Sequence, residues 1–241
     1  MQTSCLFLLA ATVISQPNAV PPMFKTYAPT MTYYYMSPDA KLGPKMLKEL
    51  LKDENIAHPF FEKNAHVLNI VAAQLGDIAA GKPEIVRQYE KELTTAPVAG
   101  QKVIITALMT CGDKETIKRL DGWLTDKRLV PVKEELETLQ KHLADPKRKH
   151  VRDRAAKTPD DLDLLWSNFF ITGEYAPIAR ILDVFDQPDA KENEVMKRVA
   201  KWSLGSNLQQ HPKLVEIVEA HTKERPDGSK KVIGELIIKA P

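Results

Sequence analysis

The stretch TPDDLDLLWSNFFITG, residues 158–173, decides the fold class. Thr158 is a good helix N-cap, Pro159 suits the first helical position, and the aspartates that follow favour the positive end of a helix dipole. Apolar side chains then occupy more than one face of the helix as far as Ile171, and Gly173 can close its end. We therefore expect a helix that is covered on several sides, with Trp166 as a core residue and not as part of a ligand site.

The same order of signals recurs on both sides of this stretch. An apolar helix ends at Gly81, at Gly112 and at Gly173, a few polar residues follow, and a second amphipathic helix begins. A weaker copy turns at His211-Pro212. Glycine closes a helix at little steric cost because it accepts a positive φ. Connections this short force the two helices of each pair to run antiparallel.

The second helices of these pairs carry matching apolar positions at Ile85, Ile117, Ile178 and Leu214. Their spacing fits a period of roughly 30–45 residues, with one poorer copy between Ile117 and Ile178, and such periods are typical of stacked helical hairpins. Over about residues 60–224 the chain therefore resembles the tetratricopeptide and HEAT-like helical-repeat class, although no copy meets the tetratricopeptide signature. The predicted fold is all-α, with stacked antiparallel hairpins like a right-handed α-solenoid.

The N-terminal residues predict export. Leu6 to Ile14 form an apolar run of the length of the hydrophobic core of a secretory signal and too short to span a bilayer, although no Lys or Arg precedes it. The alternative is a truncated or merely apolar start. We expect a periplasmic or secreted protein without a membrane span after processing. The expected segments are a signal peptide (1–19), an extended Pro/Tyr-rich arm (20–43), N-terminal hairpins (44–145), a basic linker or loop (146–157) and C-terminal hairpins (158–241).

The charges are balanced and interspersed. The chain has 34 Lys and Arg against 32 Asp and Glu, a net charge of +2, whereas a dedicated nucleic-acid binder usually has a large basic excess. One stretch departs from this balance, with five basic residues against one aspartate: Lys147, Arg148, Lys149, Arg152 and Arg154. We interpret it as a solvated loop, and the alternative is a contact with an anionic partner.

No recognisable catalytic, cofactor or metal motif is present. The six histidines have no pair at a spacing of three or four residues, so we expect them on the surface. Neither a Gly-rich phosphate loop nor a G-x-S-x-G elbow occurs. Cys5 and Cys111 cannot form a disulfide framework, and Cys111 reads as a small buried residue and not as a nucleophile.

These observations favour a non-enzymatic scaffold that binds a protein or peptide partner, without a cofactor and without nucleic acid. The alternative is an enzyme of a helical class, such as a glycan hydrolase or lyase, that lacks a short signature. An enzyme should have a deep pocket in which acids or histidines converge, and a scaffold should have a shallow groove.

Overall fold

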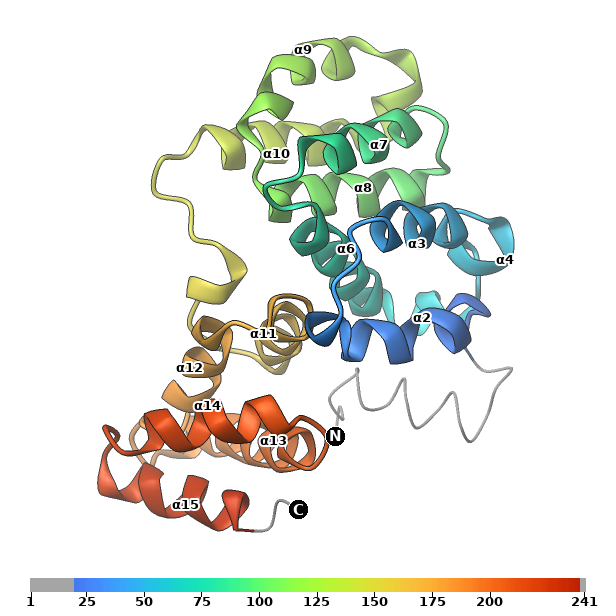
Figure 1. Ribbon diagram of the computed structural model, residues 1–241. Helices are drawn as coiled ribbons and strands as arrows, with labels where there is room; N and C mark the ends of the chain where they lie inside the picture. The colour runs from blue at the N-terminus through green and yellow to red at the C-terminus, as the bar shows by residue number, and fades with distance from the viewer. Residues whose placement is uncertain (1–19, 239–241) are drawn as a thin grey trace. The chain divides into compact units, whose positions relative to one another are not determined.

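The computed structural model describes residues 20–238, and within them the chain forms α-helices and short 3-10 turns without a β-strand (Figure 1). The predicted all-α class is therefore confirmed. Contacts divide the described chain into two compact units. The N-terminal unit holds residues 20–150 with 170–172, and the C-terminal unit holds residues 151–169 with 173–238.

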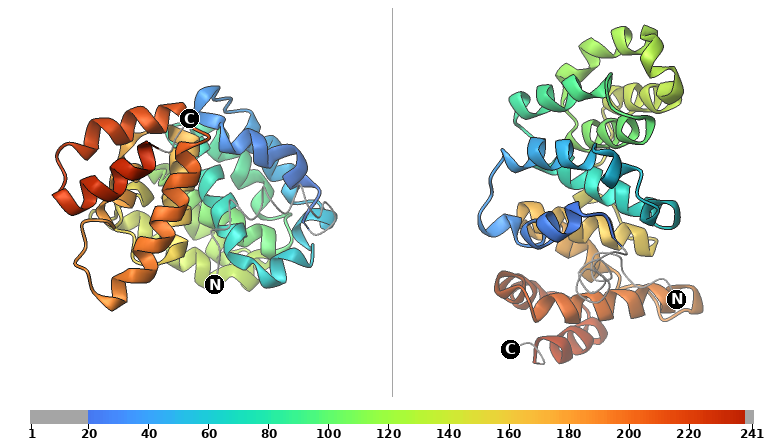
Figure 2. Two further views of the ribbon diagram at one scale, coloured as in Figure 1. Left: turned by 90° about the horizontal axis from the view of Figure 1, so that it is seen from below. Right: turned by 90° about the vertical axis from the view of Figure 1, so that its right-hand side faces the viewer.

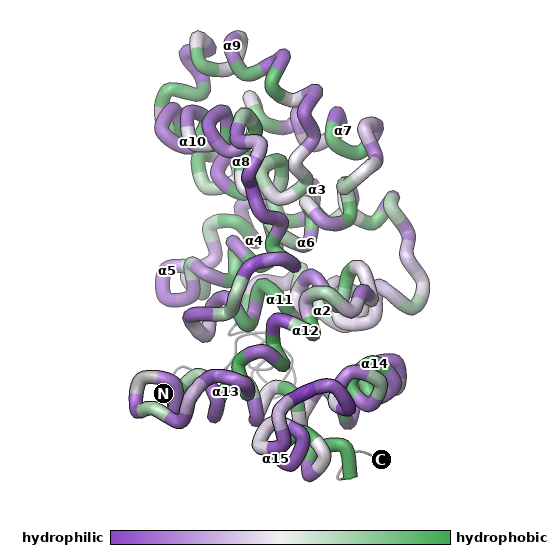
Figure 3. The backbone as a smooth tube through the Cα atoms, turned by 90° about the vertical axis from the view of Figure 1, so that its left-hand side faces the viewer, coloured by the Kyte–Doolittle hydropathy of each residue, from purple (hydrophilic) through white to green (hydrophobic). Residues whose placement is uncertain are grey.

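The predicted signal peptide lies outside the described residues. None of the helices in residues 20–238 is long and apolar enough to cross a membrane. Along the labelled helices, hydrophilic and hydrophobic residues alternate within a few positions, as in helices that bury one face (Figure 3).

The N-terminal unit is built around α6 and α8. Both helices are rich in small and branched apolar residues, and α6 buries nearly all of its side chains from Ile70 onward. Helix α6 packs on α8, and α8 packs on α7 and α10. The elements are α2 (Met23–Thr32), η1 (Tyr34–Met36), α3 (Leu42–Leu50), α4 (Asp53–Ile56), α5 (Phe60–Lys63), α6 (Ala65–Ala79), α7 (Pro83–Leu93), α8 (Val98–Cys111), η2 (Lys114–Thr116), α9 (Ile117–Thr125), η3 (Lys127–Val132) and α10 (Lys133–Ala144).

Gly76 allows α6 and α8 to approach closely. A Cβ added at Gly76 would lie 2.5 Å from the Ala107 carbonyl oxygen and 2.6 Å from the Thr110 Cβ, and both of these atoms belong to α8. Real Cβ atoms do not approach other atoms so closely, so the two helices would have to separate. The backbone of α6 is therefore in direct contact with α8 at this point.

The extended arm predicted for residues 20–43 is wrong, because α2 is a regular helix that contains Pro29. Pro29 removes one backbone donor, but the helix buries Met23, Phe24 and Met31 in the unit. The ring of Phe24 meets that of Phe61 edge to face at a centroid distance of 6.0 Å. The Met23 backbone N–H donates to Asn55 Oδ1 at 3.0 Å. Tertiary packing thus outweighs the helix-breaking tendency of the prolines.

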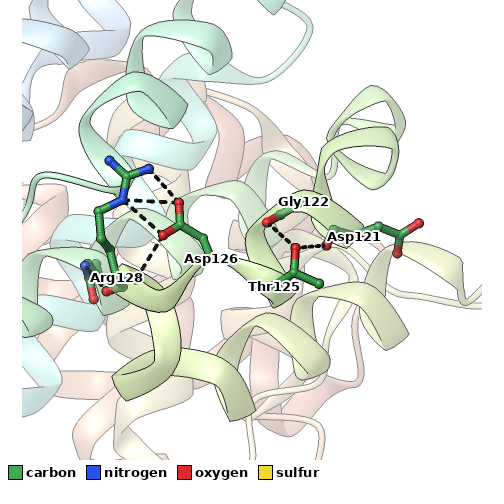
Figure 4. A network of polar contacts seen from close by, with 6 residues as sticks. Asp121, Gly122, Thr125, Asp126 and Arg128 are labelled. Atoms are coloured by element: carbon green, nitrogen blue, oxygen red, sulfur yellow. Dashed lines mark hydrogen bonds and ion pairs between the residues drawn. The ribbon is translucent and has the colours of Figure 1, made fainter.

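The turn from α9 to η3 is fixed by bonds between residues close in sequence (Figure 4). The Thr125 hydroxyl donates to the carbonyl oxygens of Asp121 at 3.1 Å and Gly122 at 3.0 Å. The Asp126 carboxylate accepts from Arg128 Nη2 at 2.6 Å and from the Arg128 backbone N–H at 2.9 Å. These hydrogen bonds lower the pKa of Asp126 to about 2.

The C-terminal unit contains most of α11 and the helices that follow it. Its elements are η4 (Val151–Asp153), α11 (Pro159–Thr172), α12 (Tyr175–Asp183), α13 (Lys191–Leu208), α14 (Pro212–Thr222) and α15 (Asp227–Ile237). Trp166 is 1% exposed, and its indole N–H donates to Ser203 Oγ on α13 at 3.1 Å. The prediction that Trp166 is a core residue is confirmed. Helices α13, α14 and α15, orange to red in the figures, contact one another (Figures 1 and 2).

The predicted helix ends are confirmed. Gly81, Gly112 and Gly173 have positive φ angles of 70°, 68° and 62°, and no other described residue does. Thr158 forms a capping box with Asp161 at the start of α11, as its sequence predicts.

Candidate functional site

A pocket of about 690 Å³ opens to solvent on the C-terminal unit. Its walls come from the turn after α12, from one face of α13 and from the start of α15. Apolar atoms make up the larger part of the wall, with contributions from Phe185, Pro188, Trp202 and Val232. The pocket therefore combines an apolar surface with the charged groups described next.

Helix α13 presents cations and an aromatic ring to the pocket. Lys197 and Lys201 are one turn apart, as are Arg198 and Trp202, so the four side chains share one side of the helix. Trp202 is 44% exposed. Tryptophan is enriched among the residues that dominate protein binding, so an indole this exposed beside a pocket is a candidate binding group.

Helix α15 turns its N-terminus toward the same pocket, where Pro226, Gly228 and Ser229 line the wall. Pro226 is the N-cap residue, and it has no side-chain acceptor for the first-turn N–H groups. The first bond of the helix is that from Lys230 N–H to the Pro226 carbonyl oxygen at 2.9 Å. Anions are favoured at such a helix end, because N–H groups and the helix dipole point toward them.

Ion pairs fix the turns that surround the pocket. Lys197 Nζ donates to Asp189 Oδ1 at 2.6 Å, and this bond lowers the pKa of Asp189. Arg225, which precedes α15, donates to Asp186 Oδ2 at 2.5 Å and to Asp183 Oδ1 at 3.0 Å. Arg225 therefore ties the α14–α15 turn to the end of α12, and both segments lie beside the pocket.

The basic stretch proposed as an anionic contact is divided between the two units. Arg148 Nη2 donates to the Gly112 carbonyl oxygen at 2.6 Å and so closes the end of α8. Arg152 Nη1 donates to Glu174 Oε2 at 2.5 Å within the C-terminal unit. Lys147 is exposed, as are Lys149 and Arg154. Arg148 and Arg152 thus bond to other residues of the chain, and contact of the basic stretch with an anionic partner stays a prediction.

Cys111 lies near the end of α8 in the N-terminal unit. Burial raises the pKa of its thiol to about 11, so the thiol stays protonated at neutral pH. The thiolate is the nucleophilic form, so this environment does not favour a nucleophile, but Cys111 is half-buried and not the buried residue that its sequence predicts. Cys5 lies outside the described residues.

The expectation of surface histidines is wrong for His211. Its side chain is fully buried and meets the Phe169 ring edge to face at 6.1 Å. Burial lowers its pKa to about 4, so it is neutral at physiological pH. His211 precedes Pro212 at the start of α14, and the chain turns inward there. Among the described residues, no three His, Cys, Asp or Glu side chains are grouped as metal ligands.

Comparisons with protein families, with characterised proteins and with solved structures found no match for this chain. The function of the candidate site is therefore inferred from the geometry of the site alone. Sequence reasoning missed it because its parts come from three separated segments. The signals present were the indole of Trp202 on a helix rich in Lys and Arg, and the sequence Pro226 to Ser229, which has the composition of a turn.

Proposed function

We propose that the chain is an exported, non-enzymatic helical-repeat protein that binds a peptide segment of a partner protein in the pocket between α13 and α15. The observation that carries this proposal is the exposed Trp202 in an open, largely apolar pocket with cations on one wall. Aromatic and arginine side chains are enriched among residues that dominate protein binding.

The packing order supports a stacked-hairpin arrangement within each unit. Residues 80–82 connect α6 to α7, and residues 209–211 connect α13 to α14. In the N-terminal unit α6 packs on α8 and α8 on α10, and in the C-terminal unit α13 packs on α15. Contacts between alternate helices are typical of helical-hairpin repeats, which use their surfaces to bind other proteins.

The experiment is a selection from random peptide libraries on the purified full chain. One library is displayed with free C-termini and the second with its C-termini tethered. We expect at least one library to give binders whose affinity falls about tenfold or more in Trp202→Ala.

The matched control is Val195→Ala, which removes another exposed apolar side chain of α13 that does not line the pocket. Binding to this variant should be unchanged. Failure of both libraries, or binders that do not require Trp202, would contradict the proposed function. The mature N-terminus, which export places near Gln16 or Val20, is determined separately by mass spectrometry.

A further inference from the structure

The first turn of α15 lacks acceptors. The backbone N–H groups of Asp227, Gly228 and Ser229 have no hydrogen-bond partner among residues 20–238. Such groups are ordinarily satisfied by a capping side chain, by water or by a ligand. Pro226 supplies no capping side chain. Gly228 and Ser229 line the pocket, so a ligand there can offer an acceptor to their N–H groups.

The Ser229 side chain gives a second and independent indication. Ser229 is only 4% exposed, it lines the pocket, and its hydroxyl makes no hydrogen bond to another residue of the described chain. The Ser229 hydroxyl oxygen is not one of the fully buried polar atoms without a partner, so it is open to the pocket and can bond to water or to a ligand there. A ligand acceptor in the pocket would complete both the hydroxyl and the helix N-terminus.

The charges of the pocket fit one negative charge. Its lining contains three cations and two acids, so a single positive charge is left in excess. The carboxylate of Asp189 neutralises the charge of Lys197, and Glu235 lies 4.0 Å from Lys201 and partly neutralises its charge. Arg198 is exposed and makes no ion pair with a residue of the described part of the chain. A carboxylate matches this balance better than a doubly charged phosphate does.

The apolar wall indicates what the anion is attached to. Phe185, Pro188 and Trp202 offer an apolar surface beside the N-terminus of α15. We propose that the pocket captures the C-terminal carboxylate of a peptide whose last side chain is apolar. This inference rests on the proposed function and specifies its ligand. The carboxylate accepts from the N–H groups of Gly228 and Ser229 and from the Ser229 hydroxyl, and the last side chain packs on Trp202.

Gly228 gives access to this position. A Cβ added at Gly228 would meet no atom within 4 Å, and Gly228 has no positive φ, so other residues fit there without strain. Gly228→Asp therefore adds a second negative side chain, beside Asp227, at the N-terminus of α15, where it favours the helix. The same carboxylate repels a ligand carboxylate. This variant separates binding from folding.

The test uses the 15N-labelled full chain and acetyl-Ala-Ala-Ala-Leu, prepared as the free acid and as the C-terminal amide. Inorganic phosphate is a third probe. We expect the acid to shift the amide resonances of Gly228 and Ser229 in a saturable way and to bind about tenfold or more tightly than the amide. Gly228→Asp should abolish the binding while the melting temperature stays the same or rises. Gly122→Asp, the same change at an open helical glycine of the N-terminal unit, should bind the acid normally.

Equal affinity for acid and amide overturns the inference, as does the absence of shifts at Gly228 and Ser229 with the acid. Tighter binding of inorganic phosphate than of the acid assigns the site to phosphate groups and also overturns it. Library binders with tethered C-termini that require Trp202 would leave the proposed function standing while this inference fails. The absence of any library binder contradicts the proposed function itself.

Discussion

Gly76→Ala should destabilise the N-terminal unit although alanine is the better helix former. The new Cβ would lie 2.5 Å from the Ala107 carbonyl oxygen and 2.6 Å from the Thr110 Cβ. Carbon atoms pack best at about 3.5–4.0 Å, so α6 and α8 must separate by about 1 Å. Overpacking of this kind costs about 1–3 kcal/mol, against a gain of about 0.5–1 kcal/mol from helix propensity. We expect a net loss of about 1–2 kcal/mol.

Gly122→Ala is the matched control, because Gly122 lies inside α9 and a Cβ there would meet nothing within 4 Å. It should stabilise the unit by about 0.5–1 kcal/mol. The measurement is urea unfolding followed by far-UV circular dichroism, with two transitions fitted where the units unfold separately. A Gly76→Ala variant as stable as the wild type, or a rank order in which it exceeds Gly122→Ala, would refute the close approach of α6 and α8.

Three further perturbations test other parts of the structure. Trp166→Ala removes a side chain that is 1% exposed, and it should lower the free energy of unfolding in urea by about 3–5 kcal/mol. A loss below about 1 kcal/mol with native helicity would show that Trp166 is not a core residue. Gly81→Ala should cost about 1–2 kcal/mol through its positive φ alone. Gly112→Ala should cost more, because its Cβ would displace the Arg148 guanidinium and break its hydrogen bond to the Gly112 carbonyl oxygen. Equal losses would contradict the role of Arg148. The carboxyl of Asp126 should titrate near pKa 2 by NMR and return toward its ordinary value of about 3.9 in Arg128→Gln. Because folding lowers this pKa, the interaction between Asp126 and Arg128 stabilises the fold above about pH 4, and this stabilisation is lost as the pH falls through about 2. An unchanged Asp126 pKa in Arg128→Gln would show that Arg128 is not the cause of the shift.

The helix ends were predictable because they depend on local chemistry. Gly81, Gly112 and Gly173 adopt the positive φ that a glycine after an apolar helix predicts. The capping box at Thr158 is likewise contained in four consecutive residues. In each case a backbone conformation that only a few residue types favour is encoded at the position itself.

Features that depend on distant packing could not be predicted in this way. The prolines of α2 argue against a helix, but Phe24 gains contacts with Phe61 that the local sequence does not show. His211 is polar and follows a helix, and only its burial against Phe169 makes it a neutral core residue. Periodicity describes one helix at a time, so it cannot say which side chains of other helices cover a given position.

The candidate site is the strongest example of this limit, because Pro226 to Gly228 has the composition of a turn and yet begins α15. A proline N-cap forgoes about 1 kcal/mol that a serine or aspartate would supply, and a glycine in the first turn costs up to a similar amount relative to alanine. The start of α15 therefore lacks the contribution of a capping side chain, and Asp227 in the first turn supplies only the favourable charge. A bound carboxylate would provide the missing acceptor, so binding and the order of α15 should be linked. The proline N-cap and the first-turn glycine lower the stability of this helix end, and they also leave its N–H groups open to a ligand in the pocket beside Trp202.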